Sequence, residues 1–492
     1  MRSRLNRLLV ANRGEIACRI IDTARALGIQ TVAVRHPLDH KARHAEMADV
    51  VRVIEGDTAV AAHLDGAQLI DIARETGCDA VHPGYGFLSE NARFASAVVD
   101  AGLVFIGPSA NTIALMGDKI AAREFAAAHG VPVAPSVMPT SDLQSFAEAA
   151  ARIGFPLMVK AAAGGGGKGM NVVRLPAELA ERAALASSEA TRYFGDPRIY
   201  AERFIEQPRH IEVQVLGDGS GRVIHLGERE CSIQRRFQKV IEEAPSAGLP
   251  PATREQVIES ALRLASAARY ANAGTVEFVV SPDGTAFFLE MNTRLQVEHR
   301  VTELIYGVDL VAMQLAIACG QPLPEQHALR AAGHAIECRI CAEDPQRDFL
   351  PQTGRVLRVV QPQDSWVVFD SGLQEGQLVG TSFDSMLAKL VVVGADRDEA
   401  IRRMVRALHG TAVLGLTTNL EFLARVIAHP AFQAGELHTG FLPLHAKDLG
   451  NPAMTPAERT HALLAAAMAH HGWRDPALSA QEHHARLGSW RN

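Results

Sequence analysis

The sequence contains few cysteines and no long apolar segment. Six cysteines are scattered over 492 residues, a pattern that excludes a disulfide-built secreted scaffold and favours reduced thiols. No stretch approaches the roughly 18 consecutive apolar residues of a membrane span, and the apolar run at residues 8–11 is too short for a signal peptide. We therefore expect a cytoplasmic protein that does not enter a membrane.

An excess of positive charge is also absent. The chain has 49 Lys and Arg against 55 Asp and Glu, a formal net charge of −6, so no basic field is available to hold nucleic acid. Apolar residues make up 47%, aromatic residues 5% and charged residues 21%, which is ordinary globular composition. At roughly 150 residues per domain, the length accommodates about three domains.

Two common nucleotide-binding motifs are missing. Residues 7–34 read as strand, turn, helix and strand, the start of a parallel βαβ layer, but the first turn contains Gly14 alone, which excludes the dinucleotide motif GxGxxG. The run Gly164–Gly167 is not a Walker A motif, because Ala162 and Gly169 stand where that motif has Gly and Ser/Thr. It joins two strand-like runs, which favours a phosphate-covering hairpin over a flexible linker.

A paired-cysteine metal motif is not completed. Cys338 and Cys341 lie in HAIECRICAE, whose alternation predicts a strand, so their side chains face opposite sides. No second CxxC and no spaced His pair follows. We expect two packed thiols here, in preference to a zinc or redox site.

The chain changes character near residue 115. The segment LMGDKIAAREFAAAHGVPVAP predicts a helix with stop signals at Gly130 and Pro132. A strand-rich block begins near Gly333. The expected domains are 1–115, 116–330 with a lid at about 132–204, 331–446, and a helical tail, 447–492.

Two carboxylates are predicted to face each other on a hairpin. If Asp283 and Gly284 form a two-residue turn, Glu277 lies directly opposite Glu290. Like charges in that position repel, so a cation is expected between them. With Asn292 on the same strand face, this oxygen-only ligand set suits Mg²⁺ bound together with a nucleotide.

The second strand of this hairpin is predicted to continue with one polar face. Glu290, Asn292, Arg294, Gln296 and Glu298 share one side by alternation, and largely apolar residues share the other. A solvent-exposed strand would alternate in the same way, but this combination of residues favours a functional site. A bend after Arg294 would move Gln296 and Glu298 away from the metal.

The charged segment ERECSIQRRFQKVIEEAP has two interpretations. Its charged residues include Arg229, Arg235, Arg236, Lys239, Glu242 and Glu243. Such a mixture is usually a salt-bridged exposed segment. The basic groups would equally serve to bind a small anion.

Seven motifs, taken in order, resemble those of biotin carboxylase, an ATP-grasp enzyme. They are HPGYGFLSEN (82–91), LMGDK (115–119), KAAAGGGGKGM (160–170), RHIEVQVLGD (209–218), ERECSIQRRFQKVIEEAP (228–245), EMNTRLQVEH (290–299) and ECRICAEDP (337–345). The resemblance covers about residues 5–445. It implies a mixed α/β and α+β fold: an N-terminal Rossmann-like parallel βαβ domain that precedes the ATP-grasp, a central ATP-grasp domain with a mobile lid, and a strand-rich C-terminal domain.

The resemblance also implies a role for each matching residue. ATP contacts would come from Lys119, Lys160, the Gly166–Gly167 lid, His210 and Gln234, with Glu202, Arg203, Phe204 and Ile205 beside the adenine. Mg²⁺, or Mn²⁺ as a substitute, would bind Glu277, Glu290 and Asn292. Bicarbonate would contact Lys239, Arg294, Gln296 and the Val297 backbone, with Glu298 as the catalytic base. Tyr85 and Arg339 would meet biotin, and Arg339 would stabilise its enolate-like ring.

The expected reaction is carboxylation of biotin by ATP and bicarbonate through carboxyphosphate, the first half-reaction of an acyl-CoA carboxylase. No Ala-Met-Lys-Met tetrapeptide occurs, so the biotin would be carried on a separate protein or on a domain outside this sequence. The expected partners are that carrier, an acyl-CoA carboxyltransferase and a second copy of the chain.

Four departures from the family pattern leave alternatives open. Phe237 and Arg300 replace a usual His and Pro, and Glu230 and Cys341 replace a usual Asp and Asn. A scaffold subunit that binds nucleotide without turnover is one alternative. An ATP-grasp ligase that joins a carboxylate to an amine is another, although Tyr85 and Arg339 match biotin contacts.

Overall fold

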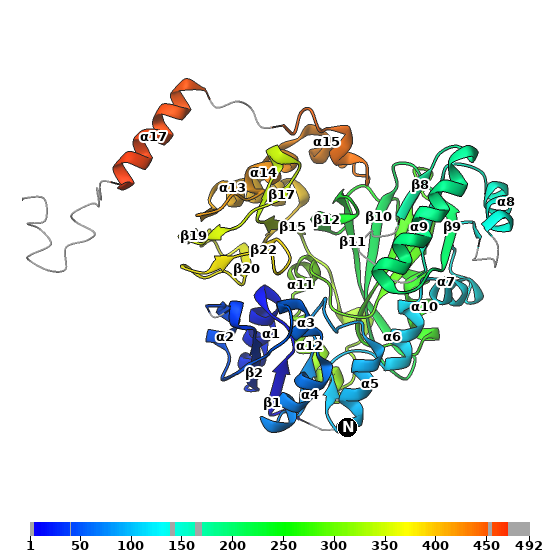
Figure 1. Cartoon of the computed structure of the whole chain (residues 1–492), viewed down its shortest axis with the longest axis horizontal. Coiled ribbons are helices and arrows are strands. Elements are labelled where there is room, and N and C mark those ends of the chain that lie inside the picture. Colours follow the sequence, from blue (N-terminus) through cyan, green and yellow to red (C-terminus); the bar gives the residue numbers. More distant parts are fainter. Residues whose placement is uncertain (1–3, 40, 138–142, 163–169, 451–454, 471–492) are drawn as a thin grey trace, which may run out of the picture. The chain divides into compact units, whose positions relative to one another are not determined.

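The computed structural model describes residues 4–39, 41–137, 143–162, 170–450 and 455–470. The chain divides into two units, Met1–Leu449 and Gly450–Asn492. Figure 1 shows the elements of both in chain order. In the described part of the second unit, helix α17 (Pro456–His470) occupies the Ala-rich segment.

A parallel sheet forms the N-terminal region, with the strand order β3-β2-β1-β4-β5. Its strands are β1 (Arg7–Val10), β2 (Gln30–Arg35), β3 (Val50–Val53), β4 (Ala80–His82) and β5 (Val104–Phe105). Its helices are α1 (Gly14–Ala26), α2 (Arg43–Met47), α3 (Ala59–Leu64), α4 (Gly66–Glu75), α5 (Ala92–Asp100) and α6 (Ala110–Gly117). The predicted parallel βαβ layer is therefore confirmed.

Both faces of the parallel sheet are apolar because helices cover both. Leu8 and Val10 pack with α1 in one hydrophobic cluster, whereas Leu9 and Val32 belong to another that contains residues of α4 and α5. Continuous apolar strands of this kind are typical of parallel sheets.

A smaller antiparallel sheet follows, with the order β6-β9-β7-β8. It comprises β6 (Ser136–Val137), β7 (Leu157–Ala161), β8 (Met170–Val173) and β9 (Ile199–Arg203), and it packs with helices α8 (Leu143–Ile153) and α9 (Leu179–Phe194). Helix α7 (Lys119–Ala128), which precedes this sheet in the chain, packs instead in the core of the large sheet described next. The pairing of β7 with β8 confirms the two strands predicted around the glycine run. The single helix predicted from Leu115 is instead two, because Asp118 accepts hydrogen bonds from the backbone of Ile120 and Ala121 and so caps α7.

The largest sheet is antiparallel, with eight strands in the order β14-β13-β10-β11-β12-β15-β22-β20. Its strands are β10 (Arg209–Asp218), β11 (Val223–Arg235), β12 (Gln238–Ala244), β13 (Ala271–Val280), β14 (Ala286–Asn292), β15 (His334–Cys341), β20 (Val367–Ser371) and β22 (Met386–Gly394). The pairing of β12 with β15 carries the sheet across residue 330, from the predicted ATP-grasp domain into the predicted C-terminal domain.

The two faces of this large sheet differ. One face is apolar and packs against α10 (Pro251–Ala267) and against α13 (Arg397–His409) with α14 (Leu420–Ala428). Ile211 and Ile336 lie on that apolar face. Because successive side chains of a strand point to opposite faces, Glu212 and Glu337 lie on the other face. Helix α11 (His299–Tyr306), followed by α12 (Leu310–Ala318), contacts the strands near this charged side.

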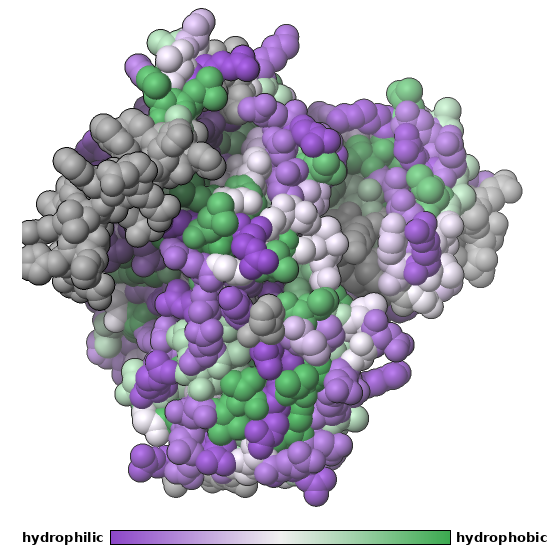
Figure 2. All heavy atoms as spheres, turned by 60° about the vertical axis from the view of Figure 1, so that its left-hand side comes forward, coloured by the Kyte–Doolittle hydropathy of each residue, from purple (hydrophilic) through white to green (hydrophobic). Residues whose placement is uncertain are grey.

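The C-terminal region adds short elements. They are β16 (Glu343–Asp344), β17 (Leu350–Pro351), β18 (Gly354–Arg355), β19 (Arg358–Val360), β21 (Leu378–Val379), β23 (Ala412–Leu414), α15 (Pro430–Gln433) and α16 (Phe441–Leu444). All six cysteines are free thiols. On the face drawn in Figure 2, hydrophilic residues predominate and hydrophobic residues form separate patches. Within the described residues no single helix could cross a bilayer by length and apolarity, and α11 with α12 meets that test only as a pair bent by 92°.

Candidate active site

One cavity of about 370 Å³ brings together most of the predicted site residues. Those that line it are Lys119, Lys160, Glu202, Arg203, Phe204, Ile205, His210, Gln234, Lys239, Glu277, Glu290, Asn292, Arg294, Gln296, Val297, Glu298 and Arg339. The volume lies within the range of small-molecule sites. Tyr85 is not among the lining residues, and Gly166 and Gly167 lie outside the described residues.

The predicted carboxylate pair is confirmed, but the reason for it differs from the prediction. Glu277 on β13 lies opposite Glu290 on β14. Near the turn, however, Val280 pairs with Ala286, so Asp283 and Gly284 do not form a two-residue turn. A register shift between Phe278 and Glu277 restores the pairing, since a β-bulge adds one residue to one strand.

The oxygen atoms at this pair suit Mg²⁺. Asn292 Nδ2 donates to Glu277 Oε1 at 2.8 Å, and Glu290 Oε2 lies 3.7 Å from Lys119 Nζ. Burial opposes ionisation of Glu277, but Lys239 and His210 outweigh it and hold its pKa well below the usual range. Two carboxylates and an amide beside a cavity are hard oxygen donors, so the residues present fit the ion by their chemistry.

His210 and Gln234 form a fixed hydrogen-bonded chain to Glu277. The amide Nε2 of Gln234 donates to His210 Nδ1 at 2.6 Å, so the ring carries its proton on Nε2 and donates it to Glu277 Oε2 at 2.7 Å. These contacts orient the imidazole at the cavity wall.

Lys160 and Glu202 form a buried ion pair at the other end of the cavity. Glu202 contacts Lys160 Nζ and also pairs with Arg123 at 2.9 Å. Burial lowers the pKa of Lys160 despite its partner, and the pKa of Glu202 is lowered because Lys160 and Arg123 outweigh the opposing effect of its burial. Arg123 was not predicted as a site residue.

Lys239 is the central cation of the site. Its Nζ lies 2.8 Å from Glu277 Oε1 and 2.7 Å from Glu298 Oε1, and it also contacts Glu212. Burial disfavours its charge, but the three carboxylates raise its pKa well above the ordinary value. Lys239 therefore stays protonated.

Glu298 is held between two cations. Its Oε1 contacts Lys239, and its Oε2 lies 2.8 Å from Arg339 Nη2. Burial would raise its pKa, but Lys239, Arg339 and Arg229 hold that pKa far below the usual range. In this arrangement Glu298 is an ionised carboxylate whose basicity depends on its cations staying in place.

The prediction that this strand continues to Glu298 is wrong. β14 ends at Asn292, and Arg294, Gln296 and Glu298 lie on the connection to α11. They still converge, because Gln296 Nε2 donates to Glu277 Oε1 at 2.9 Å and Arg294 Nη2 donates to Asn292 Oδ1 at 3.1 Å. Loop geometry, and not strand alternation, brings these side chains together.

Tyr85 and Val297 contact a second network. The Tyr85 hydroxyl donates to Glu15, which pairs with Lys389 Nζ at 3.3 Å. Lys389 Nζ also donates to the carbonyl oxygen of Val297 at 2.8 Å. This network connects the N-terminal helix α1 to the residue that precedes Glu298.

Several functional neighbours were not predicted from the sequence. Glu90 accepts from Arg294 Nε at 2.8 Å, and Glu212 binds both Arg229 and Lys239. Lys389 is the one charged residue of β22, whose other residues are apolar or glycine. That isolated charge is the signal that could have identified Lys389, and Glu90 and Glu212 carry no such signal.

The segment 228–245 is not an exposed charged surface. It forms the hairpin β11–β12, in which Arg229 and Glu242 are fully buried. Arg229 forms an ion pair with Glu212. Arg235 and Arg236 form ion pairs with Asp348, which lies outside the hairpin. Of the basic residues singled out there, Lys239 alone lines the cavity.

The two main departures from the family pattern leave these contacts in place. Phe237 lies at the β11–β12 turn with φ of 64° and is 47% exposed. Arg300 is neutralised by Asp370, at 2.6 and 2.9 Å, and by Glu303 at 2.8 Å. Two neighbouring carboxylates therefore compensate the positive charge that Arg300 adds.

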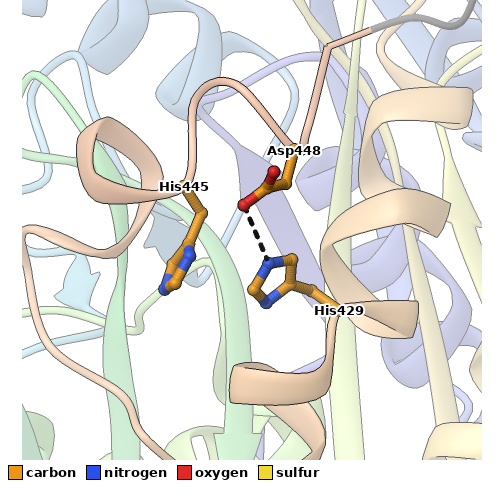
Figure 3. Close-up of side chains that lie close together, drawn as sticks. All are labelled: His429, His445 and Asp448. Atoms are coloured by element: carbon orange, nitrogen blue, oxygen red, sulfur yellow. Dashed lines mark ion pairs between the residues drawn. The ribbon is translucent and has the colours of Figure 1, made fainter.

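A second cluster of metal-ligating residues lies away from this cavity: His429, His445 and Asp448 (Figure 3). Their ligand atoms lie within 4.8 Å of one another, and His429 Nε2 is 3.9 Å from Asp448 Oδ2. His429 Nδ1, however, accepts the backbone N–H of Ala431, which leaves the proton of the neutral ring on Nε2. A metal requires an unprotonated nitrogen, so this geometry fits a helix cap beside an acid better than a metal site.

Residues 118–326 match the family described as "Carbamoyl-phosphate synthase L chain, ATP binding domain". Fold and cavity thus define an ATP-binding enzyme of the ATP-grasp class. Residues 4–113 match "Biotin carboxylase, N-terminal domain" and residues 337–443 match "Biotin carboxylase C-terminal domain". The chain belongs to the biotin carboxylase family, and the resemblance inferred from its motifs is confirmed.

Two curated relatives illustrate the range of the family. The chain is 47% identical over 443 residues to biotin carboxylase of Halalkalibacterium halodurans, covering 90% of this chain and 98% of that protein. It is 43% identical over 467 residues to the mitochondrial methylcrotonoyl-CoA carboxylase subunit alpha of Dictyostelium discoideum, covering 94% and 67%. The corresponding mouse subunit is covered to 62%, so the chain spans about two thirds of these subunits.

Solved structures confirm the predicted fold class. The biotin carboxylase domain dimer of Hydrogenobacter thermophilus 2-oxoglutarate carboxylase, in complex with MgADP, ADP and bicarbonate, superimposes with a TM-score of 0.89 at 41% identity, covering 91% of this chain and 99% of that one. Biotin carboxylase of Campylobacter jejuni gives 0.88 at 40% identity, covering 90% and 99%.

Proposed function

We propose that this chain carboxylates biotin with ATP and bicarbonate, as the first half-reaction of an acyl-CoA carboxylase. The biotin is attached to a carrier outside the sequence, and a carboxyltransferase subunit consumes the carboxybiotin. Family membership and the near-complete coverage of biotin carboxylase from H. halodurans support the first half-reaction. The similarity to methylcrotonoyl-CoA carboxylase alpha subunits supports the acyl-CoA context. We also propose that two copies of the chain associate.

One end of the cavity binds the nucleotide. Lys119, Lys160 and His210 contact the phosphates, Gln234 orients His210, and Glu202–Ile205 lies beside the adenine. Glu277, Glu290 and Asn292 would hold a magnesium ion, which would supply positive charge that neutralises the phosphates. Protonated Lys239 and Arg294 add positive charge where negative charge develops.

The observation that carries the mechanism is the position of Glu298 between Lys239 and Arg339. Bicarbonate is an anion and competes for Lys239, Arg294 and the Gln296 amide. As Lys239 turns to the substrate, Glu298 loses its strongest stabilising charge, and its pKa rises toward the value that a base needs. Glu298 then takes the bicarbonate proton, and the resulting oxyanion attacks the γ-phosphoryl group to give carboxyphosphate and ADP.

The second part of the reaction uses the same cations. Carboxyphosphate breaks down to CO₂ and phosphate, and the phosphate takes the N1′ proton of biotin. Arg339 stabilises the enolate-like ring that attacks CO₂. The family resemblance assigns a biotin contact to Tyr85 as well, although Tyr85 does not line the cavity. Exclusion of water from the cavity protects the short-lived acyl phosphate.

ADP release with MgATP tests this function, measured with and without bicarbonate and free biotin. Wild-type protein is expected to require both for full turnover, and Glu298→Gln is expected to lose about 10² to 10⁴-fold as a missing general base. Glu259→Gln, which changes an exposed carboxylate on α10, is the matched control. Wild-type protein that binds ATP without biotin-dependent turnover would contradict the proposal and favour a scaffold.

A further inference from the structure

Two buried carboxyl groups face each other behind Arg339. Glu242 on β12 and Glu337 on β15 are directly opposite in the antiparallel ladder, and both are fully buried. Directly opposed residues have Cβ atoms about 5 Å apart, and like charges there destabilise the pair. The sheet therefore holds two acids in a position that two carboxylates would not tolerate.

The hydrogen bonds around this pair are incomplete. Among the described residues, neither oxygen of Glu337 has a hydrogen-bond partner, and Glu242 Oε2 has none. An ionised carboxylate without partners is very costly to bury, whereas a neutral acid is less so. Glu337 is accordingly the member that carries a proton, and burial raises its pKa well above the ordinary value.

In the described part of the chain, Arg339 is the one side chain that donates a hydrogen bond to Glu242. Arg339 Nε donates to Glu242 Oε1 at 2.6 Å, and Arg339 Nη2 lies 2.8 Å from Glu298 Oε2. The guanidinium thus bridges Glu242 to the base of the proposed reaction. Burial raises the pKa of Glu242 to about 7, with Glu298 acting in the same direction and Arg339 and Lys239 opposing it.

The charged groups that face this pair come from every element packed around it. Lys239 and Arg339 belong to the two strands themselves, Lys389 comes from the neighbouring strand β22, and Glu298 lies at the start of α11. Lys389 is already engaged by the Val297 carbonyl and by Glu15. The division of Arg339 between Glu242 and Glu298 is therefore the adjustable contact.

We propose that Glu242 and Glu337 together hold one proton while Glu242 is ionised, and that Glu242 is a positioning residue for Arg339, dividing the guanidinium between itself and Glu298. Ionised Glu242 draws Arg339 toward itself, so Glu298 is held less tightly and is a better base. Protonated Glu242 releases Arg339 to Glu298, which then stays an ionised, weak base. This inference rests on the proposed function, because it assigns a control over the same base.

The pH dependence of biotin- and bicarbonate-dependent ADP release tests the positioning role. In wild-type protein kcat is expected to fall as the pH drops through about 7, where Glu242 takes up its proton. Glu242→Gln is expected to lose this acid limb and to lower kcat about ten-fold, the effect of one lost charged hydrogen bond, with KM for ATP unchanged. Glu242→Asp keeps the carboxylate and is expected to restore the limb.

Infrared spectroscopy tests the shared proton without requiring turnover. The carboxylic-acid C=O band is separate from the carboxylate band, and Glu337→Gln is expected to remove one acid band above neutral pH. The exposed control Glu259→Gln is expected to leave the acid band and the pH profile unchanged. An unaltered band in Glu337→Gln, or an intact acid limb and kcat in Glu242→Gln, overturns the inference.

Failure of the proposed function can be told apart from failure of this inference. If wild-type protein shows no turnover, the proposed function is overturned, and the infrared result still shows whether Glu337 carries a proton. If Glu242→Gln does not fold, Glu242→Asp and Glu337→Gln decide the question.

Discussion

The parallel sheet and the eight-stranded antiparallel sheet are both buried, but they bury opposite chemistry. In the parallel sheet, Leu9 and Val32 are fully buried apolar residues under helices. In the antiparallel sheet, Glu212, Arg229 and Lys389 are equally buried and carry charge. The first arrangement stabilises the fold through the hydrophobic effect. The second arrangement is costly, because charged groups lose their hydration when they are buried. This cost is offset where opposite charges face one another across the site.

The comparison implies that mutations in the two sheets have separable effects. Changes on the charged face should reduce turnover more than stability, and changes in the parallel sheet should reduce stability more than turnover.

The largest effect is expected for Lys239→Met. It removes the common cation of Glu212, Glu277 and Glu298, so kcat/KM for bicarbonate should fall about 10³-fold. Lys447→Met, at an exposed position, is the control, and a loss below about ten-fold would remove Lys239 from the centre of the site.

A smaller effect, on stability alone, is expected in the parallel sheet. Leu9→Ala leaves a cavity at a fully buried position on β1 and should lower the free energy of unfolding by about 2–5 kcal/mol. Urea unfolding measures this loss, with Val53→Ala at a 47% exposed position of β3 as control. Turnover per folded molecule should stay the same. A fall in kcat of the folded Leu9→Ala protein would contradict the separation of the two sheets.

Acid should weaken the parallel sheet through a buried histidine. Burial lowers the pKa of His82 on β4 to about 4, from the ordinary histidine value of 6.5. The unfolded chain therefore binds a proton that the folded chain does not between these values, and stability falls as the pH drops from about 6.5 toward 4, by up to about 1.4 kcal/mol per pH unit. Unfolding free energies at about pH 7 and about pH 5 should differ less in His82→Asn. An equal difference in both proteins would refute the assignment to His82.

The smallest effect is expected at the cavity rim. Phe237→His restores a polar group at an exposed turn residue, worth about one hydrogen bond, so KM for ATP should fall by less than about ten-fold. KM for bicarbonate is the internal control, because Lys239 and Arg294 are unchanged. A change in kcat with KM for ATP unaltered would assign Phe237 to a step other than nucleotide binding.

The hairpin of β13 and β14 shows how far the sequence predicts this site. The pairing of Glu277 with Glu290 is predicted and found, yet the turn is not the one assumed, and a bulge supplies the register. A bulge adds one unpaired residue to one strand, and the alternation of residues along the sequence does not show where this extra residue falls. Beyond Asn292 the alternation continues in the sequence while the strand has ended.

The buried partners were harder to predict than the residues they hold. Glu242 is the clearest case, since a charged run suggested an exposed segment, whereas the residue is fully buried against Arg339 from a strand that follows about 100 residues later. Glu90 reaches Arg294 across an even longer separation in sequence. Pairings of this kind depend on the order of the strands in the folded sheet. Short sequence patterns do not reveal that order.

The sequence by itself determined the fold class, the family and many of the residues that line the cavity, because the order and spacing of motifs are properties of the chain alone. The tertiary structure alone decided which charges compensate one another: Lys239 among three carboxylates, Glu298 between two cations, and Glu242 opposite Glu337. The physical reason is that electrostatic energy in a buried site depends on distances between groups that are remote in sequence. Those distances exist only once the antiparallel sheet has formed.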